Sequence, residues 1–303
     1  MSVVAIIAAL LLEQWRPLVE RKAYHALLAR YANWLENTFN AGESRHGRIA
    51  WTVAAAPLVL GSLALYYLLL WLHPLFALGL NIAALYVTLG FRQFSHSFTA
   101  IQLELKAENL DRARELIGTW RGESAAHRPK EEVVRLAIEE ALAASHQHVF
   151  AVLFWFMLLP GPSGAILYRL AGFLARRWSA QGNFGTFAMR VYDAMEWPAV
   201  RLTAIAFAVV GDFEDAIYCW RTQAAGWADP KLGIVLAAGA GAMGVRLGMP
   251  LAEADGTVLP RPDLGLGESA DVPFLDSTVG LLWRSLVVWV FLLALLTVAR
   301  IFG

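Results

Sequence analysis

Residues 51–71 read WTVAAAPLVLGSLALYYLLLW, and this stretch decides the fold class. It contains no charged residue, and it is long enough to cross a bilayer as a helix, which takes about 20 residues. Trp51 and Trp71 stand at its two ends, where aromatic rings suit the membrane–water interfaces. The stretch therefore predicts a membrane-spanning helix.

A second uncharged run, Leu75–Phe91, follows directly after His73-Pro74. Because proline interrupts a helix, the two runs predict a helical hairpin across the bilayer. The tip of this hairpin contains no Lys or Arg, whereas the segments before and after the hairpin contain many. The positive-inside rule therefore places both flanks in the cytoplasm.

The composition agrees with a membrane protein. Hydrophobic residues make up 58% of the chain and charged residues 17%, more apolar than soluble domains usually are. The net charge is zero, so no nucleic-acid partner is predicted. The apolar composition instead predicts the lipid bilayer as the partner. Cys219 is the only cysteine, which excludes an internal disulfide, and we expect it to be a buried small residue.

Two further apolar segments lie near the chain ends. Met1–Leu12 is short for a full span, so it is either a tilted anchor that continues past Glu13 or a helix in the interface. Leu281–Ile301 predicts another transmembrane helix, bounded by Arg284 and Arg300.

The middle of the chain predicts a broken membrane helix. Val149–Leu159 is apolar, Pro160-Gly161-Pro162 interrupts it, and Ser163–Leu174 resumes the helix. Broken helices at membrane depth occur where protein or water satisfies the freed backbone groups, so the break is a candidate cavity lining. Arg201–Val210 is too short to cross, which favours a re-entrant or interfacial segment.

The polar segments are also helical in pattern. Phe98–Arg121 is amphipathic with charges of both signs, and Pro129 suits the first turn of the next helix. Gly233–Gly248 is rich in Gly and Ala, which permits close helix contact. Leu251–Asp276 is rich in Pro, Gly and Asp, which is typical of a loop.

The predicted fold class is all-α: a polytopic integral membrane protein with about four or five membrane helices plus cytoplasmic and re-entrant helices. We expect one domain. Its predicted parts are an N-terminal anchor and basic segment (1–50), a transmembrane hairpin (51–91), cytoplasmic helices (92–148), a broken membrane helix with the candidate site (149–250), a loop (251–280) and a C-terminal transmembrane helix (281–303).

Common enzyme signatures are absent from the sequence. There is no GxxxxGK[ST] loop, GxSxG elbow or HExxH pair. His146 and His148 would point about 200° apart on a helix, so they predict no metal site. The glycines of Gly239–Gly248 could cradle a phosphate, although Gly/Ala spacing in a membrane protein usually means packing.

Ionisable residues beside apolar runs are the most informative polar feature. They are Glu139, Arg169, Asp193, Glu196 and Arg201. Charges near a bilayer are costly, so each is a candidate for a paired internal site. The alternative is that the arginines snorkel to lipid phosphates and the acids lie in cytoplasmic water.

Four stretches resemble the CobD/CbiB family of adenosylcobinamide-phosphate synthases and their relatives, the AmpE proteins. They are Arg135–Trp155 (RLAIEEALAASHQHVFAVLFW), Gly161–Arg169 (GPSGAILYR), Phe184–Thr203 (FGTFAMRVYDAMEWPAVRLT) and Gly239–Pro250 (GAGAMGVRLGMP). The resemblance covers roughly residues 90 to 267.

The resemblance implies a membrane enzyme of cobalamin biosynthesis that joins a corrinoid carboxylate to aminopropanol phosphate, with ATP and Mg²⁺ as cofactors. It implies Glu139 and Asp193 as catalytic residues. It also implies substrate contacts from Tyr168, Arg169, Arg190, Arg201 and Arg246.

Some positions depart from the family pattern. The Glu-Asn…Asp cluster that follows the position of Glu139 in the family is replaced here by Ala143, Ala144 and Gln147, and Tyr192 replaces one Asp of an Asp-Asp pair. These losses remove carboxylates that would bind a metal. The alternative is therefore a non-catalytic AmpE-like regulatory or ligand-binding protein, since EWPAVRL at 196–202 also resembles an AmpE segment.

The sequence leaves the choice between enzyme and non-enzyme open. In either case the resemblance implies a multi-pass protein of the bacterial cytoplasmic (inner) membrane. A corrinoid or another phosphate-bearing small molecule is the expected ligand, and a homo-oligomer is compatible with the sequence.

Overall fold

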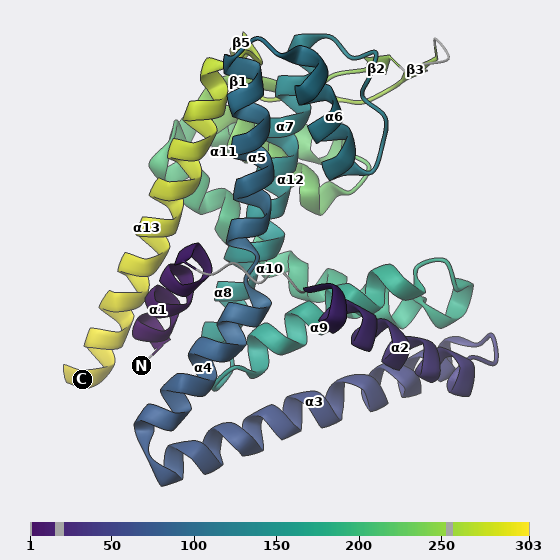
Figure 1. The fold of residues 1–303 in the computed structure, drawn as a ribbon, viewed down its shortest axis with the longest axis vertical. Coiled ribbons are helices and arrows are strands. Elements are labelled where there is room, and N and C mark those ends of the chain that lie inside the picture. The colour runs from purple at the N-terminus through teal and green to yellow at the C-terminus, as the bar shows by residue number, and fades with distance from the viewer. Residues whose placement is uncertain (1, 16–20, 253–256, 303) are drawn as a thin grey trace. The chain divides into compact units, whose positions relative to one another are not determined.

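A computed structural model describes residues 2–15, 21–252 and 257–302, and helices make up most of this structure (Figure 1). The chain divides into two compact units. Unit 1 comprises Met1–Gly90 and Ala151–Pro198, and unit 2 comprises Phe91–Phe150 and Ala199–Gly303. The expectation of a single domain stays a prediction.

Unit 1 contains the predicted hairpin. Its elements are α1 (Ser2–Trp15), α2 (Arg21–Phe39), α3 (Ser44–Leu72), α4 (Pro74–Thr88), α8 (Ala151–Leu158), α9 (Ser163–Trp178), the 3₁₀ turn η2 (Gly182–Phe184) and the first half of α10 (Thr186–Val210). The turn between α3 and α4 is at His73, whose Nδ1 accepts a hydrogen bond of 3.2 Å from the backbone N–H of Leu75. Pro74 opens α4, where its missing N–H costs nothing.

An aromatic pair forms part of the core of unit 1. Trp178 and Phe184 are fully buried, and their rings lie 5.0 Å apart between centroids. Gly47 of α3 allows the close approach of this segment, because a Cβ there would lie 2.0 Å from the carbonyl oxygen of Phe184.

Unit 2 is built around α7. Its elements are α5 (Phe91–Lys106), α6 (Leu110–Arg121), α7 (Lys130–Ser145), the π-helical turn η1 (His146–Phe150), the second half of α10, α11 (Phe213–Gln223), the 3₁₀ turn η3 (Ala224–Gly226), α12 (Pro230–Met243) and α13 (Pro273–Phe302). Helix α7 contacts α5, α6, α12 and α13 and is buried along most of its length. Its polar residues therefore need partners inside the fold.

Short strands follow α12. They are β1 (Val245–Gly248), β2 (Leu251–Ala252), β3 (Val258–Leu259), β4 (Asp263–Leu264) and β5 (Glu268–Ser269). Strand β1 pairs with β4 antiparallel and with β5 in parallel, and β2 pairs with β3 antiparallel. The predicted loop therefore contains small pieces of sheet.

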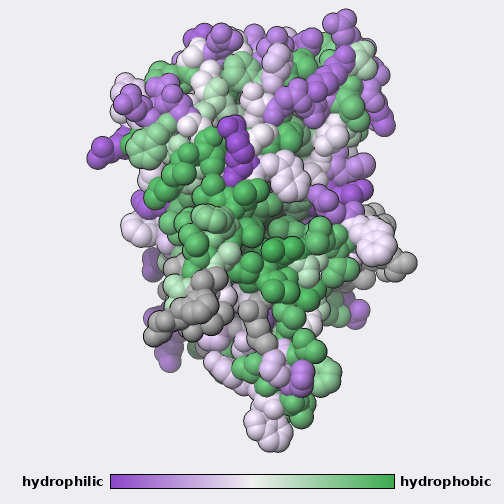
Figure 2. All heavy atoms as spheres, turned by 90° about the vertical axis from the view of Figure 1, so that its left-hand side faces the viewer, coloured by the Kyte–Doolittle hydropathy of each residue, from purple (hydrophilic) through white to green (hydrophobic). Residues whose placement is uncertain are grey.

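Helices long and apolar enough to cross a membrane confirm the predicted fold class. Within the described ranges there are four: Ser44–Leu72, Pro74–Lys106, Lys130–Leu158 and Pro273–Leu295. Large apolar side chains on α13, including Val287, Phe291 and Leu295, are exposed. Exposed apolar side chains are expected on a helix that faces lipid. Figure 2 shows hydrophobic side chains gathered on the face of the molecule that it views.

Three sequence predictions need correction. Phe98–Arg121 is not one helix, because α5 ends at Lys106 and α6 begins at Leu110, with Glu108 in a left-handed conformation (φ 58°). Arg201–Val210 is not a separate short segment, because α10 runs from Thr186 through Pro198 to Val210. The C-terminal helix begins at Pro273 rather than Leu281.

The N-terminal helix continues past Glu13 to Trp15, and residues 16–20 lie outside the described part of the chain. Its 14 residues span about 21 Å at 1.5 Å per residue, less than the roughly 30 Å hydrocarbon core. Both interpretations of this segment stay open.

Candidate functional site

Helix α7 presents a row of charged residues on one face. Glu132, Arg135 and Glu139 are three and four positions apart, the spacing that places side chains on the same side of a helix. Pro129 precedes the helix, and Glu131 with Glu132 lies in its first turn, where acidic side chains interact favourably with the helix dipole. The row lies before the apolar stretch that continues through η1 into α8.

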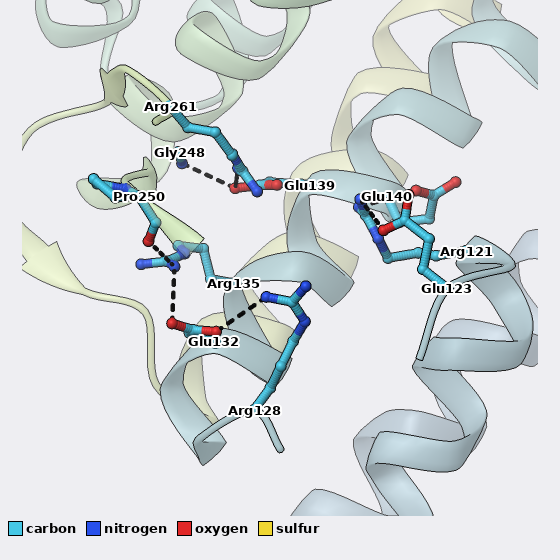
Figure 3. Close-up of polar contacts among 10 residues, drawn as sticks. All are labelled: Arg121, Glu123, Arg128, Glu132, Arg135, Glu139, Glu140, Gly248, Pro250 and Arg261. Carbon is cyan, nitrogen blue, oxygen red and sulfur yellow. Dashed lines mark hydrogen bonds and ion pairs between the residues drawn. The ribbon is translucent and has the colours of Figure 1, made fainter. Parts of the chain in front are cut away.

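Glu139 is the last residue of this row. Its side chain is 5% exposed, and Oε1 accepts two hydrogen bonds (Figure 3). One comes from the backbone N–H of Gly248 at 2.9 Å and the other from Nη2 of Arg261 at 2.5 Å. The carboxylate is thus buried and matched by a cation from a distant part of the sequence.

Arg261 is fixed by a second contact. Its guanidinium carbon lies 4.7 Å from the ring centroid of Trp227, within the range of a cation–π interaction. The side chain is 11% exposed. Stacking on one face and pairing with Glu139 at one edge hold the guanidinium plane in place.

The pairing of β1 with β4 brings these groups together. Gly248 is opposite Asp263, two residues after Arg261. Gly248 has φ +72°, and an added Cβ would lie 2.0 Å from the carbonyl oxygen of Pro262. Only glycine allows this close pairing while its N–H points to Glu139.

A second ionic group lies around the start of α7 and includes Arg128, which precedes the helix (Figure 3). Glu132 is 3.3 Å from Nη1 of Arg128 and 3.9 Å from Nη2 of Arg135. Nη2 of Arg135 is also 3.5 Å from the carbonyl oxygen of Pro250, a long contact. The arginine side chains are 3% and 4% exposed, so this is a buried charge cluster rather than a solvated surface.

The substrate-binding residues expected on α9 make contacts within unit 1. The hydroxyl of Tyr168 donates to Oε1 of Glu196 at 2.5 Å and lies 3.5 Å from the hydroxyl of Tyr192. Nε of Arg169 donates to the carbonyl oxygen of Thr88 at 2.6 Å. Arg169 thus provides a hydrogen-bond donor for a carbonyl group at the C-terminal end of α4.

The remaining expected site residues are less buried. Arg190 and Asp193 are exposed on α10, Arg201 is half-buried on the same helix, and Arg246 is exposed on β1. Tyr168, Arg169, Arg190 and Asp193 belong to unit 1, whereas Glu139, Arg201 and Arg246 belong to unit 2. Their convergence on one substrate stays a prediction.

Sequence reasoning missed Arg135 and Arg261. Arg135 stands four residues before Glu139, so helical spacing could have identified it. Arg261 lies between Pro260 and Pro262 in a segment that the composition indicates only as a loop, and nothing in that pattern connects it with Glu139.

The site does not suit a divalent cation as it stands. Mg²⁺ is held by oxygen ligands, mainly carboxylates and water. Here Oε1 of Glu139 accepts from Arg261 and Gly248, and the described residues contain no group of three or more His, Cys, Asp and Glu side chains that could hold a metal. No reaction step is therefore assigned to a metal ion.

The Gly-rich helix does not offer a phosphate cradle either. Gly239 faces Leu142, where an added Cβ would lie 2.8 Å from a methyl carbon. An added Cβ at Gly241 would lie 2.4 Å from the carbonyl oxygen of Asp215. Neighbouring helices pack directly against both glycines, as the Gly/Ala spacing indicated.

Comparisons with known proteins bear on this site. Residues 5–281 match the family described as CobD/Cbib protein. Cobalamin biosynthesis protein CobD of Stutzerimonas stutzeri (strain A1501) is 36% identical over 302 residues, covering 95% of this chain and 96% of the relative. The protein of the same name from Chromobacterium violaceum is 33% identical over 289 residues, covering 91% of this chain and 88% of the relative.

A more distant match is cobalamin biosynthesis protein CobD of Mycobacterium tuberculosis (strain CDC 1551 / Oshkosh), 28% identical over 205 residues and 65% of each chain. No solved structure matches the chain. These matches favour the cobalamin branch of the resemblance and give no support to the AmpE-like alternative.

Proposed function

The chain belongs to the CobD/CbiB family, and from this premise we propose that it acts in cobalamin biosynthesis as a membrane-bound adenosylcobinamide-phosphate synthase. In this reaction an amide forms between the carboxylate of adenosylcobyric acid and the amine of aminopropanol phosphate. The relatives from Stutzerimonas stutzeri and Chromobacterium violaceum, both named for cobalamin biosynthesis, support the pathway.

The buried Glu139–Arg261 pair is the structural observation that carries the proposal. Both substrates bear anionic groups, and a protein binds such groups best with fixed, desolvated cations. Glu139 holds Arg261 in one orientation, so the guanidinium needs little reorganisation when an anion arrives.

The proposal assigns acid–base work to Glu139 and Asp193. It assigns contacts with phosphate or carboxylate to Tyr168, Arg169, Arg190, Arg201 and Arg246. A nucleotide, which would supply the energy for amide formation in this family, has no assigned site in the described residues. We also propose the bacterial cytoplasmic membrane as the location, a corrinoid as the ligand and a homo-oligomer as the assembly.

Purified protein in detergent tests the activity. With adenosylcobyric acid, aminopropanol phosphate, ATP and Mg²⁺, we expect ATP-dependent formation of adenosylcobinamide phosphate, measured by chromatography and mass spectrometry. Glu139→Gln should reduce kcat/KM at least 100-fold, a loss of about 2.7 kcal/mol of transition-state stabilisation.

Arg112→Met is the matched control for this assay. Arg112 is exposed on α6 and pairs with Glu115 of the same helix, so its variant should retain wild-type turnover. A strain that lacks its own synthase gives a second test: the wild-type gene should restore cobalamin formation from cobyric acid. No product in vitro, together with no restoration of cobalamin formation by the wild-type gene, would refute the proposed function. Full complementation by Glu139→Gln would refute only the role assigned to Glu139.

A further inference from the structure

Two buried arginines in unit 2 share an unusual feature. Nε of Arg135 and Nε of Arg261 are both buried, and neither has a hydrogen-bond partner among the described residues. Their side chains are only 4% and 11% exposed. Because an unsatisfied buried donor costs about 1–3 kcal/mol, and more on a charged group, each unpartnered Nε needs an explanation.

On a guanidinium, Nη2 shares one edge with Nε, and its contacts differ between the two arginines. Nη2 of Arg261 pairs with Glu139 at 2.5 Å, while Nη2 of Arg135 reaches only the carbonyl of Pro250 at 3.5 Å and Glu132 at 3.9 Å. Arg135 is therefore a buried cation whose described contacts are all long. Figure 3 shows both arginines on the side of α7 that faces Gly248 and Pro250.

This arrangement has the chemistry of an oxyanion site. A guanidinium offers five N–H donors in a fixed fork, which matches two oxygens of a phosphate at once. Charge-assisted bonds of this kind are about twice as strong as neutral ones, and burial strengthens them further. An incoming dianion would also supply the negative charge that Arg135 meets only at long range.

We propose that Arg135 and Arg261 form a phosphate subsite that works without a metal ion, with the unpartnered Nε–H groups as its donors. Arg135 is the main contact, and Arg261 links the bound phosphate to Glu139. The ligand is a soluble phosphate ester. This inference deepens the proposed function and rests on it for the source of the phosphate, since amide formation there takes a phosphate ester as substrate.

Binding of inorganic phosphate to the full chain tests the subsite. The protein is purified in dodecyl maltoside, which contains no phosphate, and titrated with phosphate in the presence of a chelator by calorimetry. We expect saturable binding without a divalent cation. Arg135→Lys should weaken it at least tenfold and Arg261→Lys about tenfold, because lysine keeps the charge and lacks the fork.

Arg112→Lys is the matched control, since it makes the same exchange at an exposed arginine, and its affinity should equal that of the wild type. All variants are compared by gel filtration, so a folding failure is separated from a loss of binding. Equal phosphate affinity in wild type and Arg135→Lys would overturn the proposal. So would binding that needs Mg²⁺, tighter binding of acetate than of phosphate, or binding of phosphatidylglycerol in nanodiscs without binding of inorganic phosphate.

The amide assay separates this inference from the proposed function. If turnover is present, Arg135→Lys should raise KM for aminopropanol phosphate at least tenfold and leave KM for the corrinoid unchanged. Phosphate binding without any amide product would refute the proposed function and leave the subsite standing. Turnover with an unchanged KM in Arg135→Lys would refute the subsite alone.

Discussion

The Glu139 and Arg261 side chains are 5% and 11% exposed, so each charge depends on the other for compensation. Removing one partner of a buried pair leaves an unmatched charge, which typically costs about 3–5 kcal/mol. The Arg112–Glu115 pair on α6 is 49% and 64% exposed, and water can replace either partner there. We therefore expect the Glu139–Arg261 pair to affect the free energy of unfolding much more than the Arg112–Glu115 pair.

Neutralising one acid in each pair tests this difference. Glu139→Gln should lower the free energy of unfolding by about 3 kcal/mol, and Glu115→Gln by less than about 1 kcal/mol. Thermal unfolding of the detergent-solubilised variants, followed by circular dichroism, provides the measurement. A double variant with Arg261→Met should recover part of the loss, because it removes the orphaned cation. Equal melting temperatures for the two single variants would contradict the assignment of a buried pair.

Cys219 provides a pH-dependent test of burial. The side chain is fully buried on α11, and burial, followed by the negative charge of Asp215, raises the pKa of the thiol to about 11. The thiolate is the reactive form, so the thiol stays protonated and unreactive until the pH approaches that value. A maleimide should label folded protein only slowly at pH 7–9 and label it fully after denaturation in SDS. The single cysteine makes the readout unambiguous, and rapid labelling of folded protein at pH 7 would contradict this burial.

At the scale of elements, the contact between α11 and α12 depends on the absence of a side chain. An added Cβ at Gly241 would lie 2.4 Å from the carbonyl oxygen of Asp215 and 2.8 Å from the Cα of Ala216. Both are backbone atoms of the neighbouring helix, so they cannot move aside alone. Gly79 of α4, by contrast, has nothing within 4 Å of an added Cβ.

Alanine at these two glycines should therefore have opposite effects. Gly241→Ala should destabilise the protein by about 1–3 kcal/mol through overpacking. Gly79→Ala should stabilise it by up to about 1 kcal/mol, because alanine is the better helix former. Thermal unfolding of the two variants beside the wild type gives the comparison, and a Gly241→Ala protein as stable as the wild type would show that the helices do not pack this closely.

The same elements show what a sequence pattern can predict. The α3–α4 turn at His73-Pro74 was predictable because proline acts locally on its own backbone. The break before α6 was missed, since Glu108 has no property that favours a left-handed conformation. Arg201–Val210 was treated as a short segment of its own, whereas α10 runs from Thr186 through Pro198 to Val210 as one helix. Local chemistry predicts an element only where tertiary contacts do not outweigh it.

At the scale of the whole molecule, the lipid-facing helices were predictable and the site was predictable only in part. A helix in hydrocarbon needs apolar side chains along its whole length, so composition alone is enough to identify α3 or α13. Glu139 was identified from its place beside an apolar run. Its partner Arg261 is 122 residues away, and that pairing follows from the strand register of β1 and β4, which no single-sequence pattern encodes.

The orientation in the membrane follows from charge and can be measured with the native cysteine removed. The hairpin tip around Leu72 lacks Lys and Arg, while the segments on both sides of the hairpin are basic. We therefore expect the tip outside the cytoplasm and the α6–α7 loop inside it. In a Cys219→Ser background, Leu72→Cys should react with a membrane-impermeant maleimide in intact cells. Glu123→Cys, an exposed position in the α6–α7 loop, should react only after the cells are opened. Labelling of Glu123→Cys in intact cells would reverse the orientation, and it would place the Glu139–Arg261 site on the side of the membrane that lacks cytoplasmic ATP.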